Sequence, residues 1–220
     1  MVRSFLLLKK RSVKKIKVLN LYAGIGGNRK LWKDVDVIAI ENNKEIAKIY
    51  QDFFPNDKVI VADAHQYLLD HYKEFDFIWS SPPCPTHSRA RFWASFGENR
   101  TKVYPDMNLY QEILFLEHYC KCKWIVENVI GYYEPLIRPQ KINRHYFWSN
   151  FIITNSDDKT LFFPKDSLPT LQKIYGVDLS KLNVDIDKRT ILRNCVNPEL
   201  GLHVFNMAFK DIQKILGSEK

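Results

Sequence analysis

One cysteine of this chain is enclosed by prolines, in the segment Pro82-Pro83-Cys84-Pro85. Proline fixes the backbone φ angle, so these prolines make a stiff loop that holds the thiol in place. A thiol attacks an electrophilic carbon as the thiolate, so nearby hydrogen-bond donors and cations matter for its reactivity. A lone cysteine is usually a packing residue, but a cysteine locked between prolines packs poorly. Cys84 is therefore a candidate nucleophile for covalent catalysis.

A carboxylate that could assist this chemistry follows a later apolar run, in Val126-Glu127-Asn128-Val129. A glutamate held in a protein interior can keep or deliver a proton to a ring nitrogen of a substrate. A thiol and a proton-donating carboxyl together would suit addition to an unsaturated ring. This chemistry requires that Cys84 and Glu127 lie side by side.

The apolar pattern supplies elements that would bring them together. Residues 44–54 and 109–119 carry apolar side chains at helical spacing, and the segments with strand character are 16–21, 35–40, 59–62, 75–79 and 124–126. Alternation of strands and helices predicts an α/β fold with a doubly wound, mostly parallel sheet. The carboxyl ends of parallel strands share one edge of the sheet, so the cysteine loop and Glu127 are expected there.

A glycine-rich turn follows the first strand, in Tyr22-Ala23-Gly24-Ile25-Gly26-Gly27. Glycines at such a turn let the backbone approach a ligand closely. Glu41 ends the second strand, where an acid commonly binds ribose hydroxyls, and Asp63 ends the third, where it could accept a hydrogen bond from an adenine amine. No Lys-Ser/Thr pair follows the glycines. A nucleoside cofactor without a pyrophosphate fits this pattern better than a nucleoside triphosphate.

Composition and charge narrow the partners. The 220 residues include 33 Lys and Arg against 25 Asp and Glu, and the net charge of +8 suits a polyanionic partner. Much of the excess lies before residue 18, where a solvated N-terminal arm is an equally good interpretation. The apolar run at residues 5–8 is too short for a signal peptide or a membrane span, so we expect a cytoplasmic protein without membrane contact.

The four cysteines are too few and unevenly spaced for a disulfide framework. His118, Cys120 and Cys122 could suggest a metal site, but no fourth ligand follows at zinc-like spacing. We therefore expect no metal.

Seven short segments in this order resemble the motifs of the DNA (cytosine-5) methyltransferase family, across residues 17–210. The proline–cysteine pair Pro83-Cys84 and the Glu127-Asn128-Val129 segment are similar to the family's two catalytic motifs. The other five similar segments are the glycine turn 22–27, Glu41, Asp63, Gln140-Lys141-Ile142-Asn143-Arg144 and Arg193-Asn194-Cys195-Val196-Asn197-Pro198. The resemblance implies the Rossmann-like fold of S-adenosylmethionine-dependent methyltransferases.

The resemblance also implies a mechanism in which a cytosine is flipped out of DNA into the pocket. Cys84 would add to carbon 6 of the ring while Glu127 protonates or hydrogen-bonds nitrogen 3, which makes carbon 5 nucleophilic. Arg144 would hold the cytosine carbonyl oxygen or a phosphate, and Asn128 would brace the cysteine loop. S-adenosylmethionine would supply the methyl group, and S-adenosylhomocysteine would be the product.

Further roles follow from the same resemblance. The implied cofactor-binding residues are Tyr22, Ala23, Gly24, Ile25, Gly26, Gly27, Glu41, Asn42, Asp63, Ala64, Pro83, Asn194, Cys195 and Val196. The implied nucleic-acid-binding residues are Ser88, Arg89, Arg91, Trp93, Gln140 and Arg144. Residues 89–104 interleave basic and aromatic side chains, a composition suited to phosphate contact and base stacking. We expect a monomer that methylates DNA, as in restriction–modification.

The chain departs from the family pattern in three places. Ile142 replaces the first arginine of the Gln-x-Arg-x-Arg motif, and Asn42 replaces an aromatic residue that stacks on adenine. Only 43 residues, 151–193, lie between Asn150 and Asn194, where the family inserts a large target-recognition region. The expected organisation is a basic arm (1–15), a catalytic and cofactor-binding domain (16–153), a small recognition segment (154–192) and a returning C-terminal helix (193–220).

Two alternatives remain open at this point. The same reaction on RNA, notably tRNA, is compatible with a short recognition segment and a basic arm. A non-catalytic relative that only binds nucleic acid is supported by Ile142 and Asn42, but the presence of Cys84, Glu127 and Arg144 argues against it.

Overall fold

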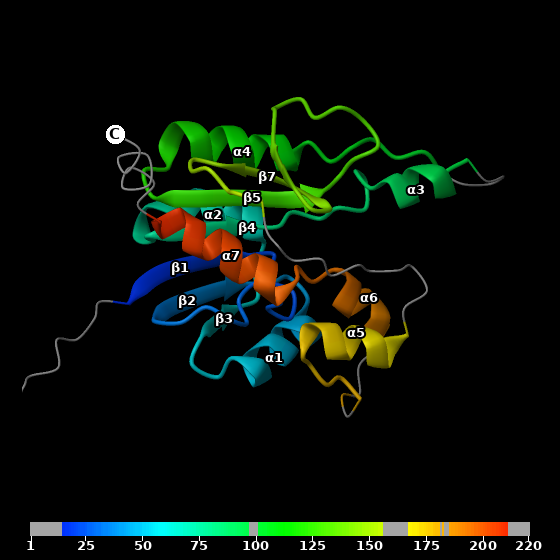
Figure 1. Ribbon diagram of the computed structural model, residues 1–220, viewed down its shortest axis with the longest axis horizontal. Coiled ribbons are helices and arrows are strands. Elements are labelled where there is room, and N and C mark those ends of the chain that lie inside the picture. The colour runs from blue at the N-terminus through cyan, green and yellow to red at the C-terminus, as the bar shows by residue number, and fades with distance from the viewer. Residues whose placement is uncertain (1–14, 97–100, 156–166, 181, 183–184, 211–220) are drawn as a thin grey trace, which may run out of the picture.

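A computed structural model describes residues 15–96, 101–155, 167–180, 182 and 185–210. Its centre is a seven-stranded sheet in the order β3-β2-β1-β4-β5-β7-β6 (Figure 1). Strands β1 to β5 are parallel, and β7 is antiparallel to both β5 and β6. The strands are β1 (Ile16–Leu21), β2 (Val35–Ile40), β3 (Lys58–Ile60), β4 (Phe77–Ser80), β5 (Lys123–Val129), β6 (Gln140–Ile142) and β7 (His145–Ser149).

The sheet confirms the predicted α/β class with a mostly parallel, doubly wound sheet. The first two strands have the predicted bounds. The prediction for the fifth strand was too short, because β5 continues to Val129 and pairs with β7 along that extension. Glu127 and Asn128 are therefore strand residues with opposite-facing side chains, since successive side chains alternate across a strand.

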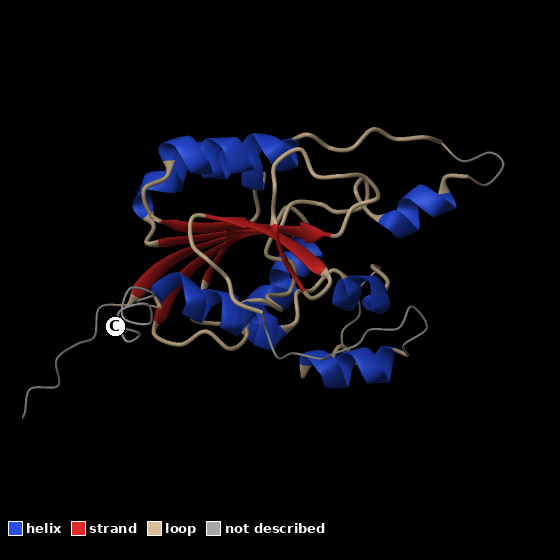
Figure 2. Ribbon diagram, turned by 45° about the horizontal axis from the view of Figure 1, so that its top comes forward, coloured by secondary structure: helices blue, strands red, loops and turns tan. Residues whose placement is uncertain are grey.

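Helices cover both faces of the sheet (Figure 2). On one face α2 (Ala64–His71), a 3₁₀ turn (Tyr72–Glu74) and α4 (Asn108–Tyr119) enclose a core that includes Leu68, Ile113 and Leu116. On the other face α7 (Pro198–Phe209) buries Leu200, Val204 and Phe205 against the sheet. Helix α1 (Lys44–Phe53) follows β2 and begins at the side-chain cap of Asn43.

The segment 155–192 contains helices that its polar composition concealed. Helix α5 (Leu168–Tyr175) begins at Ser167, whose hydroxyl caps the Thr170 amide, and ends at Gly176 with φ of 61°. Helix α6 (Lys188–Arg193) begins at the Asp187 cap. No helix was predicted in this segment, although a cap, an apolar spacing and a terminal glycine are all present in the sequence.

Helices α5 and α6 pack against the glycine turn and α1. Leu171, Tyr175 and Leu192 form a buried cluster with Ile25 of the glycine turn and Ile49 of α1. Figure 1 shows the carboxyl ends of the parallel strands between α3 (Arg89–Ala94) on one side and α5 and α6 on the other. The described part of segment 154–192, for which a recognition role was expected, therefore forms one wall of the region where the site is expected.

Within the described residues, no helix combines the length and the apolar composition needed to cross a bilayer. Residues 1–14 of the expected basic arm (1–15) and residues 211–220 of the expected C-terminal helix (193–220) lie outside the described residues.

Helix α7 reaches the glycine turn through a close backbone contact at Gly201. A Cβ added there would stand 2.4 Å from the Asn28 carbonyl oxygen, and the Trp32 indole already donates to the Gly201 carbonyl at 3.1 Å. Asn28 is itself held by the buried Asn20 side chain at 2.8 Å. This contact requires glycine because backbone atoms cannot move aside cheaply.

Gly201→Ala is expected to lower the free energy of unfolding by roughly 1–3 kcal/mol, as overpacking does in a tight core. Gly131→Ala is the matched control, because a Cβ at Gly131 would meet its neighbours at ordinary distances of 3.5 Å and more. Urea denaturation of both variants measures the effect. Equal stability of the Gly201 variant and the wild type would show that α7 does not depend on this close approach.

Candidate active site

The loop that carries Cys84 is tied to its surroundings through backbone atoms. The Cys84 carbonyl accepts hydrogen bonds from the amides of His87 at 3.0 Å and Ser88 at 3.1 Å, which makes a tight turn. The Asn128 side-chain amide donates to the Pro82 carbonyl at 3.0 Å. Asn128 is buried in β5, so this bond fastens the loop to the neighbouring strand.

Glu127 lies close enough to Cys84 for its charge to act on the thiol. Burial, and then the Glu127 carboxylate, raise the pKa of Cys84 to about 11. At neutral pH the thiol of the free protein therefore stays protonated. A thiolate forms only when something that binds beside it supplies positive charge or neutralises the carboxylate.

His145 is a neighbour of Glu127 that sequence reasoning missed. Its Nδ1 lies 2.6 Å from Glu127 Oε1. His145 pairs with Val129 in the β5–β7 register, so its side chain is on the same sheet face as Glu127, one diagonal step away. Its position directly after Arg144 was visible, but its contact with Glu127 depends on strand β7, which was not predicted.

Arg144 lies exposed at the turn between β6 and β7. Burial is the main cause that raises the pKa of Tyr175, at the end of α5. The charge of Glu127 also raises this pKa, and the charge of Arg144 lowers it. The Tyr175 hydroxyl donates to the Cys195 carbonyl at 2.9 Å. Tyr175, also missed, thus connects the arginine and glutamate to the last motif.

The rest of the Gln-x-Arg-x-Arg segment serves the fold. Ile142 is buried in the core at 4% exposure, so at this position the chain places a packing side chain and no cation. The Gln140 amide donates to Ser149 Oγ and the Phe151 carbonyl, and its oxygen accepts from the Ile153 amide. Its polar atoms are therefore engaged inside the protein, whereas Lys141 is exposed.

The glycine turn and Glu41 form one unit. Glu41 Oε2 accepts from the Gly24 amide at 3.0 Å, and Oε1 accepts from the Asn43 amide at 2.9 Å. A carboxylate has about four acceptor positions, so Glu41 can still accept from a ligand. Gly24 has a φ of 54°, and no atom lies within 4 Å of the place where a Cβ would stand. Open space beside Gly24 fits a ligand that contacts the turn closely.

The last motif closes onto this turn. The amides of Ile25 and Gly27 are directed at the Cys195 sulfur, whose pKa burial nevertheless raises to about 12. A Cβ at Gly27 would lie 2.5 Å from the Val196 carbonyl oxygen, so glycine permits the approach. Val196 is buried and Asn194 is exposed.

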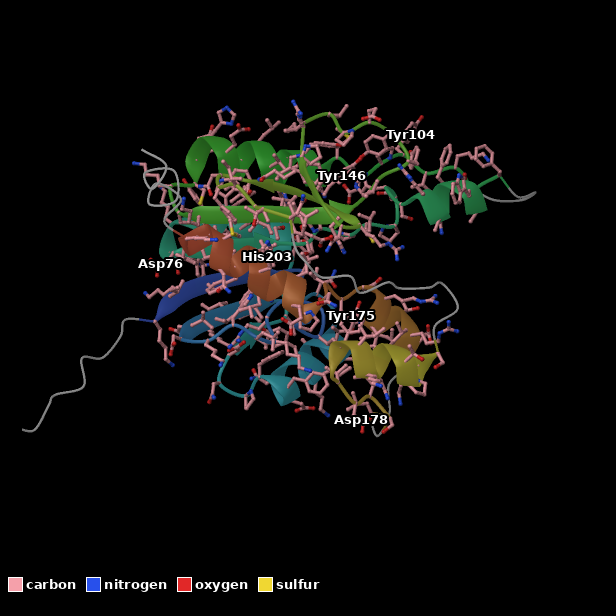
Figure 3. The ribbon with its side chains drawn as sticks, in the orientation of Figure 1. Asp76, Tyr104, Tyr146, Tyr175, Asp178 and His203 are labelled. Atoms are coloured by element: carbon pink, nitrogen blue, oxygen red, sulfur yellow. The ribbon has the colours of Figure 1, made fainter. Side chains whose placement is uncertain are left out.

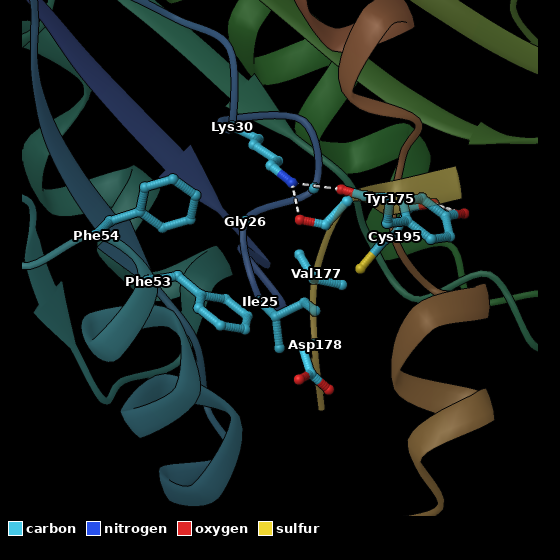
Figure 4. Close-up of a pocket in the computed structure, with 11 residues that line it drawn as sticks. Ile25, Gly26, Lys30, Phe53, Phe54, Tyr175, Val177, Asp178 and Cys195 are labelled. Atoms are coloured by element: carbon cyan, nitrogen blue, oxygen red, sulfur yellow. Dashed lines mark hydrogen bonds between the residues drawn. The ribbon is translucent and has the colours of Figure 1, made fainter. Parts of the chain in front are cut away.

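A pocket of about 380 Å³ lies beside the glycine turn (Figure 4). Its walls come from the turn, the end of α1 and the segment after α5, and Lys30 donates to the carbonyls of Tyr175 and Gly176 across it. It includes four of the residues predicted to bind a cofactor: Ile25, Gly26, Gly27 and Cys195.

The other predicted cofactor residues lie outside this pocket lining. Asp63 caps α2 by accepting from the Gln66 amide at 2.8 Å and is exposed, as are Asn42 and Pro83. Ala64 and Ala23 are buried. The predicted cofactor residues thus fall into two groups. Ile25, Gly26, Gly27 and Cys195 line the pocket, and the others, some exposed and some buried, lie outside it.

A buried carboxylate beneath the turn was also missed. Glu112 of α4 accepts from the Tyr22 hydroxyl at 2.5 Å and from Ser80 Oγ at 2.6 Å, and His65 Nδ1 lies 3.1 Å away. The hydrogen bond to Glu112 is the main cause that raises the pKa of His65. Tyr22 has a φ of 54°, which is unfavourable for a tyrosine, and Glu112 holds it between the cofactor turn and β4.

Four of the six predicted nucleic-acid residues, Ser88, Arg89, Arg91 and Trp93, lie at α3, whereas Gln140 is in β6 and Arg144 is at the β6–β7 turn. Ser88 caps α3, and Arg89 Nε donates to the Gly131 carbonyl at 3.0 Å. Arg91 is exposed and Trp93 is 69% exposed. Further exposed aromatics are Phe96 and Tyr104, and Figure 3 shows Tyr104 on the side of α3 and Tyr175 on the side of α5. Arg100 of the predicted basic–aromatic segment lies outside the described residues.

Among the residues that the structure describes, no three potential metal ligands cluster. The sulfurs of Cys120 and Cys122 lie 3.0 Å apart, between the end of α4 and the start of β5. This pair is at the opposite end of β5 from Glu127.

The sheet order, the glycine turn with its acid and the paired cysteine and glutamate define an α/β fold of the Rossmann-like methyltransferase type. Residues 16–133, more than half of the chain, match the family model for C-5 cytosine-specific DNA methylase. The chain belongs to this family, and the predicted family membership is confirmed.

Two solved structures illustrate the likeness. A methyltransferase of Entamoeba histolytica, EhMeth, has a TM-score of 0.56 and 12% identity, over 91% of this chain and 99% of that chain. A mutant of Spodoptera frugiperda DNMT2 has a TM-score of 0.42 and 20% identity, over 80% of this chain and 62% of that chain. At these identities the first supports the fold alone. A comparison with curated proteins finds no match.

Glu127→Gln is expected to lower the pKa of Cys84 below about 11, because it removes the charge that opposes the thiolate while burial remains. The measurement is the pH dependence of iodoacetamide alkylation, followed at each cysteine by peptide mass spectrometry. Cys195 is an internal control, since Glu127 is not among the causes of its raised pKa. An unchanged Cys84 profile would mean that the carboxylate does not act on the sulfur.

Glu112→Ala is expected to destabilise the protein by roughly 1–3 kcal/mol, the range for a buried polar group left without its partner. The exposed Glu117→Ala on the same helix is the control and should stay within about 0.5 kcal/mol of the wild type. Thermal unfolding of the two variants compares them. If both behave alike, Glu112 does not hold Tyr22 and Ser80 as described.

Proposed function

We propose that this protein transfers a methyl group from S-adenosylmethionine to carbon 5 of cytosine in DNA, through a covalent adduct with Cys84. The observation that carries the proposal is that Cys84 and Glu127 lie close together. The Glu127 carboxylate is near enough to raise the pKa of Cys84. Both lie at the carboxyl edge of the sheet: Cys84 follows β4, and Glu127 is near the end of the neighbouring parallel strand β5. Ligands of open α/β sheets bind at this edge.

The glycine turn fits the proposed cofactor. A nucleoside and its side chain could bind beside the turn. Gly24 leaves open space there, Glu41 supplies a carboxylate, and the last motif approaches closely at Gly27. Tyr22 and Ile25 add apolar surface to the same turn. When bound, S-adenosylmethionine supplies an activated methyl group and a positive charge near the thiol.

Cys84 and Glu127 then divide the chemistry. The sulfur of Cys84 forms a bond to carbon 6, and the electrons of the ring double bond move to carbon 5. Glu127 takes the proton of the thiol as the sulfur adds and gives it to nitrogen 3, which stabilises the ring after addition. Carbon 5 takes the methyl group and loses its proton to a general base, the sulfur leaves carbon 6, and the proton on nitrogen 3 returns through Glu127 to the sulfur.

The raised pKa of Cys84 makes this sequence depend on binding. A thiol with a pKa of about 11 is unreactive in the free protein at neutral pH. Positive charge beside the sulfur, and neutralisation of the Glu127 carboxylate by the proton that the thiol gives up, favour thiolate formation in the complex. Asn128 keeps the loop in place throughout, through its bond to Pro82.

The α3 region is the proposed contact surface for nucleic acid. Trp93, Phe96 and Tyr104 are exposed, and Arg89, Arg91 and Lys102 lie on the same segment. Exposed aromatics with basic neighbours suit base stacking and phosphate contact. The overall charge of +8 supplies attraction that does not depend on sequence.

RNA is the second candidate substrate, and one observation favours it. Helices α5 and α6 pack against the glycine turn, so the described part of the short recognition segment is occupied in building the pocket. Sequence readout in a DNA groove needs side chains placed there. A flexible or single-stranded substrate would need fewer such contacts.

Cys84→Ser is expected to reduce methyl transfer by on the order of 10³-fold or more, because the nucleophile is lost. Cys120→Ser, at the other end of β5, is the matched control and should keep activity. Transfer of labelled methyl to duplex DNA and to tRNA separates the two substrates. A DNA duplex that contains 5-fluorocytosine should trap a covalent adduct with the wild type and none with the serine variant. Full activity of Cys84→Ser would contradict the mechanism.

A further inference from the structure

His145 and Glu127 form a close pair at the carboxyl end of β5. The Nδ1 atom of His145 and Oε1 of Glu127 are 2.6 Å apart, and the two side chains are 23% and 8% exposed. Strand β7 fixes the histidine opposite Val129, at the carboxyl end of β5. The contact therefore arises from strand register, which is rigid, and does not depend on a mobile side chain reaching across solvent.

Several other charged or titratable groups face this pair. Cys84 comes from the loop after β4, Arg144 from the hairpin turn and Tyr175 from the end of α5. Arg144 is exposed at that turn, and Tyr175 is buried and hydrogen-bonded to the Cys195 carbonyl. The His145 ring lies within hydrogen-bond distance of the Glu127 carboxylate.

We propose that His145 is a positioning residue for Glu127: its Nδ1–H donates to Oε1, which turns Oε2 toward Cys84 and nitrogen 3 of the cytosine. This inference rests on the proposed function and adds a residue to it. The histidine acts through Glu127 and does not touch the substrate.

The same hydrogen bond serves the proton transfer. In the free protein Glu127 is a carboxylate, and His145 donates from Nδ1 to Oε1. As the sulfur adds to carbon 6, Oε2 takes the proton of the Cys84 thiol. When Oε2 passes its proton to nitrogen 3, a carboxylate is left in a site with little solvent, where an uncompensated charge is costly. The Nδ1–H donor stabilises that carboxylate, since hydrogen bonds to charged groups are the stronger ones. When the sulfur leaves, the proton returns from nitrogen 3 through Oε2 to the sulfur, and His145 is unchanged.

Two substitutions separate this role from simple packing. His145→Asn keeps an amide donor near the position of Nδ1 but does not titrate. His145→Leu keeps volume and removes the donor. The control is His71→Leu, which removes a similar pair, His71 Nδ1 and Glu74 Oε1 at 2.7 Å, from an exposed site away from the carboxyl edge.

The expected result is a loss in kcat of about 10- to 100-fold for His145→Leu, with the KM for S-adenosylmethionine unchanged. His145→Asn should recover most of kcat. His71→Leu should match the wild type in both kcat and KM. Thermal unfolding of each variant shows whether a loss of kcat reflects loss of fold.

A kcat for His145→Leu equal to that of the wild type would overturn the inference, as would an Asn variant no better than the Leu variant while both stay folded. A measurement without turnover tests it independently. ¹⁵N NMR of histidine-labelled protein at neutral pH should show a protonated Nδ1 at His145, and an unprotonated Nδ1 would overturn the inference. If Nδ1 is protonated but the wild type transfers no methyl group to cytosine, the proposed function fails and the pair remains.

Discussion

The hydrogen bond from the Asn128 amide to the Pro82 carbonyl is the constraint on which the site depends. Alternation along β5 directs Asn128 to the cysteine loop and the preceding Glu127 to the opposite face of the strand. One strand end thus braces the loop that carries the thiol and also supplies the carboxylate. The prolines around Cys84 limit the loop's own freedom, so a single buried bond is enough to set its distance from the strand.

Placing a carboxylate beside a thiol has an electrostatic consequence. Each negative charge opposes the other, and burial raises the pKa of Cys84 further, to about 11. The free protein therefore holds the Cys84 thiol in the protonated, unreactive form. Thiolate formation is coupled to whatever enters the site, a coupling that limits side reactions of the cysteine. The glycine turn, Glu41 and the last motif lie around the same edge. The expected cofactor site is therefore close to the Cys84 thiol.

The small size of the chain concentrates several roles in few elements. Helix α5 packs on Ile25 and α1, its end accepts hydrogen bonds from Lys30, and Tyr175 reaches the last motif. Helix α7 approaches the glycine turn at Gly201, where the backbones touch. The glycine turn is thus supported by three helices that are distant in sequence: α4, through Glu112, and also α5 and α7. The rigidity of the turn comes from this packing, because the turn itself is short.

The sequence by itself determined the α/β class, the parallel strands, the glycine turn and the likeness of Cys84 and Glu127 to a catalytic pair. Local signals carried these: apolar runs, glycines, prolines and short motifs have meaning within a few residues. Tertiary structure alone decided that Ile142 faces the core, that Gln140 is used internally and that Glu112, His145 and Tyr175 join the site. Those contacts depend on strand register and on helix packing between segments distant in sequence, which patterns within a few residues of each other do not reveal.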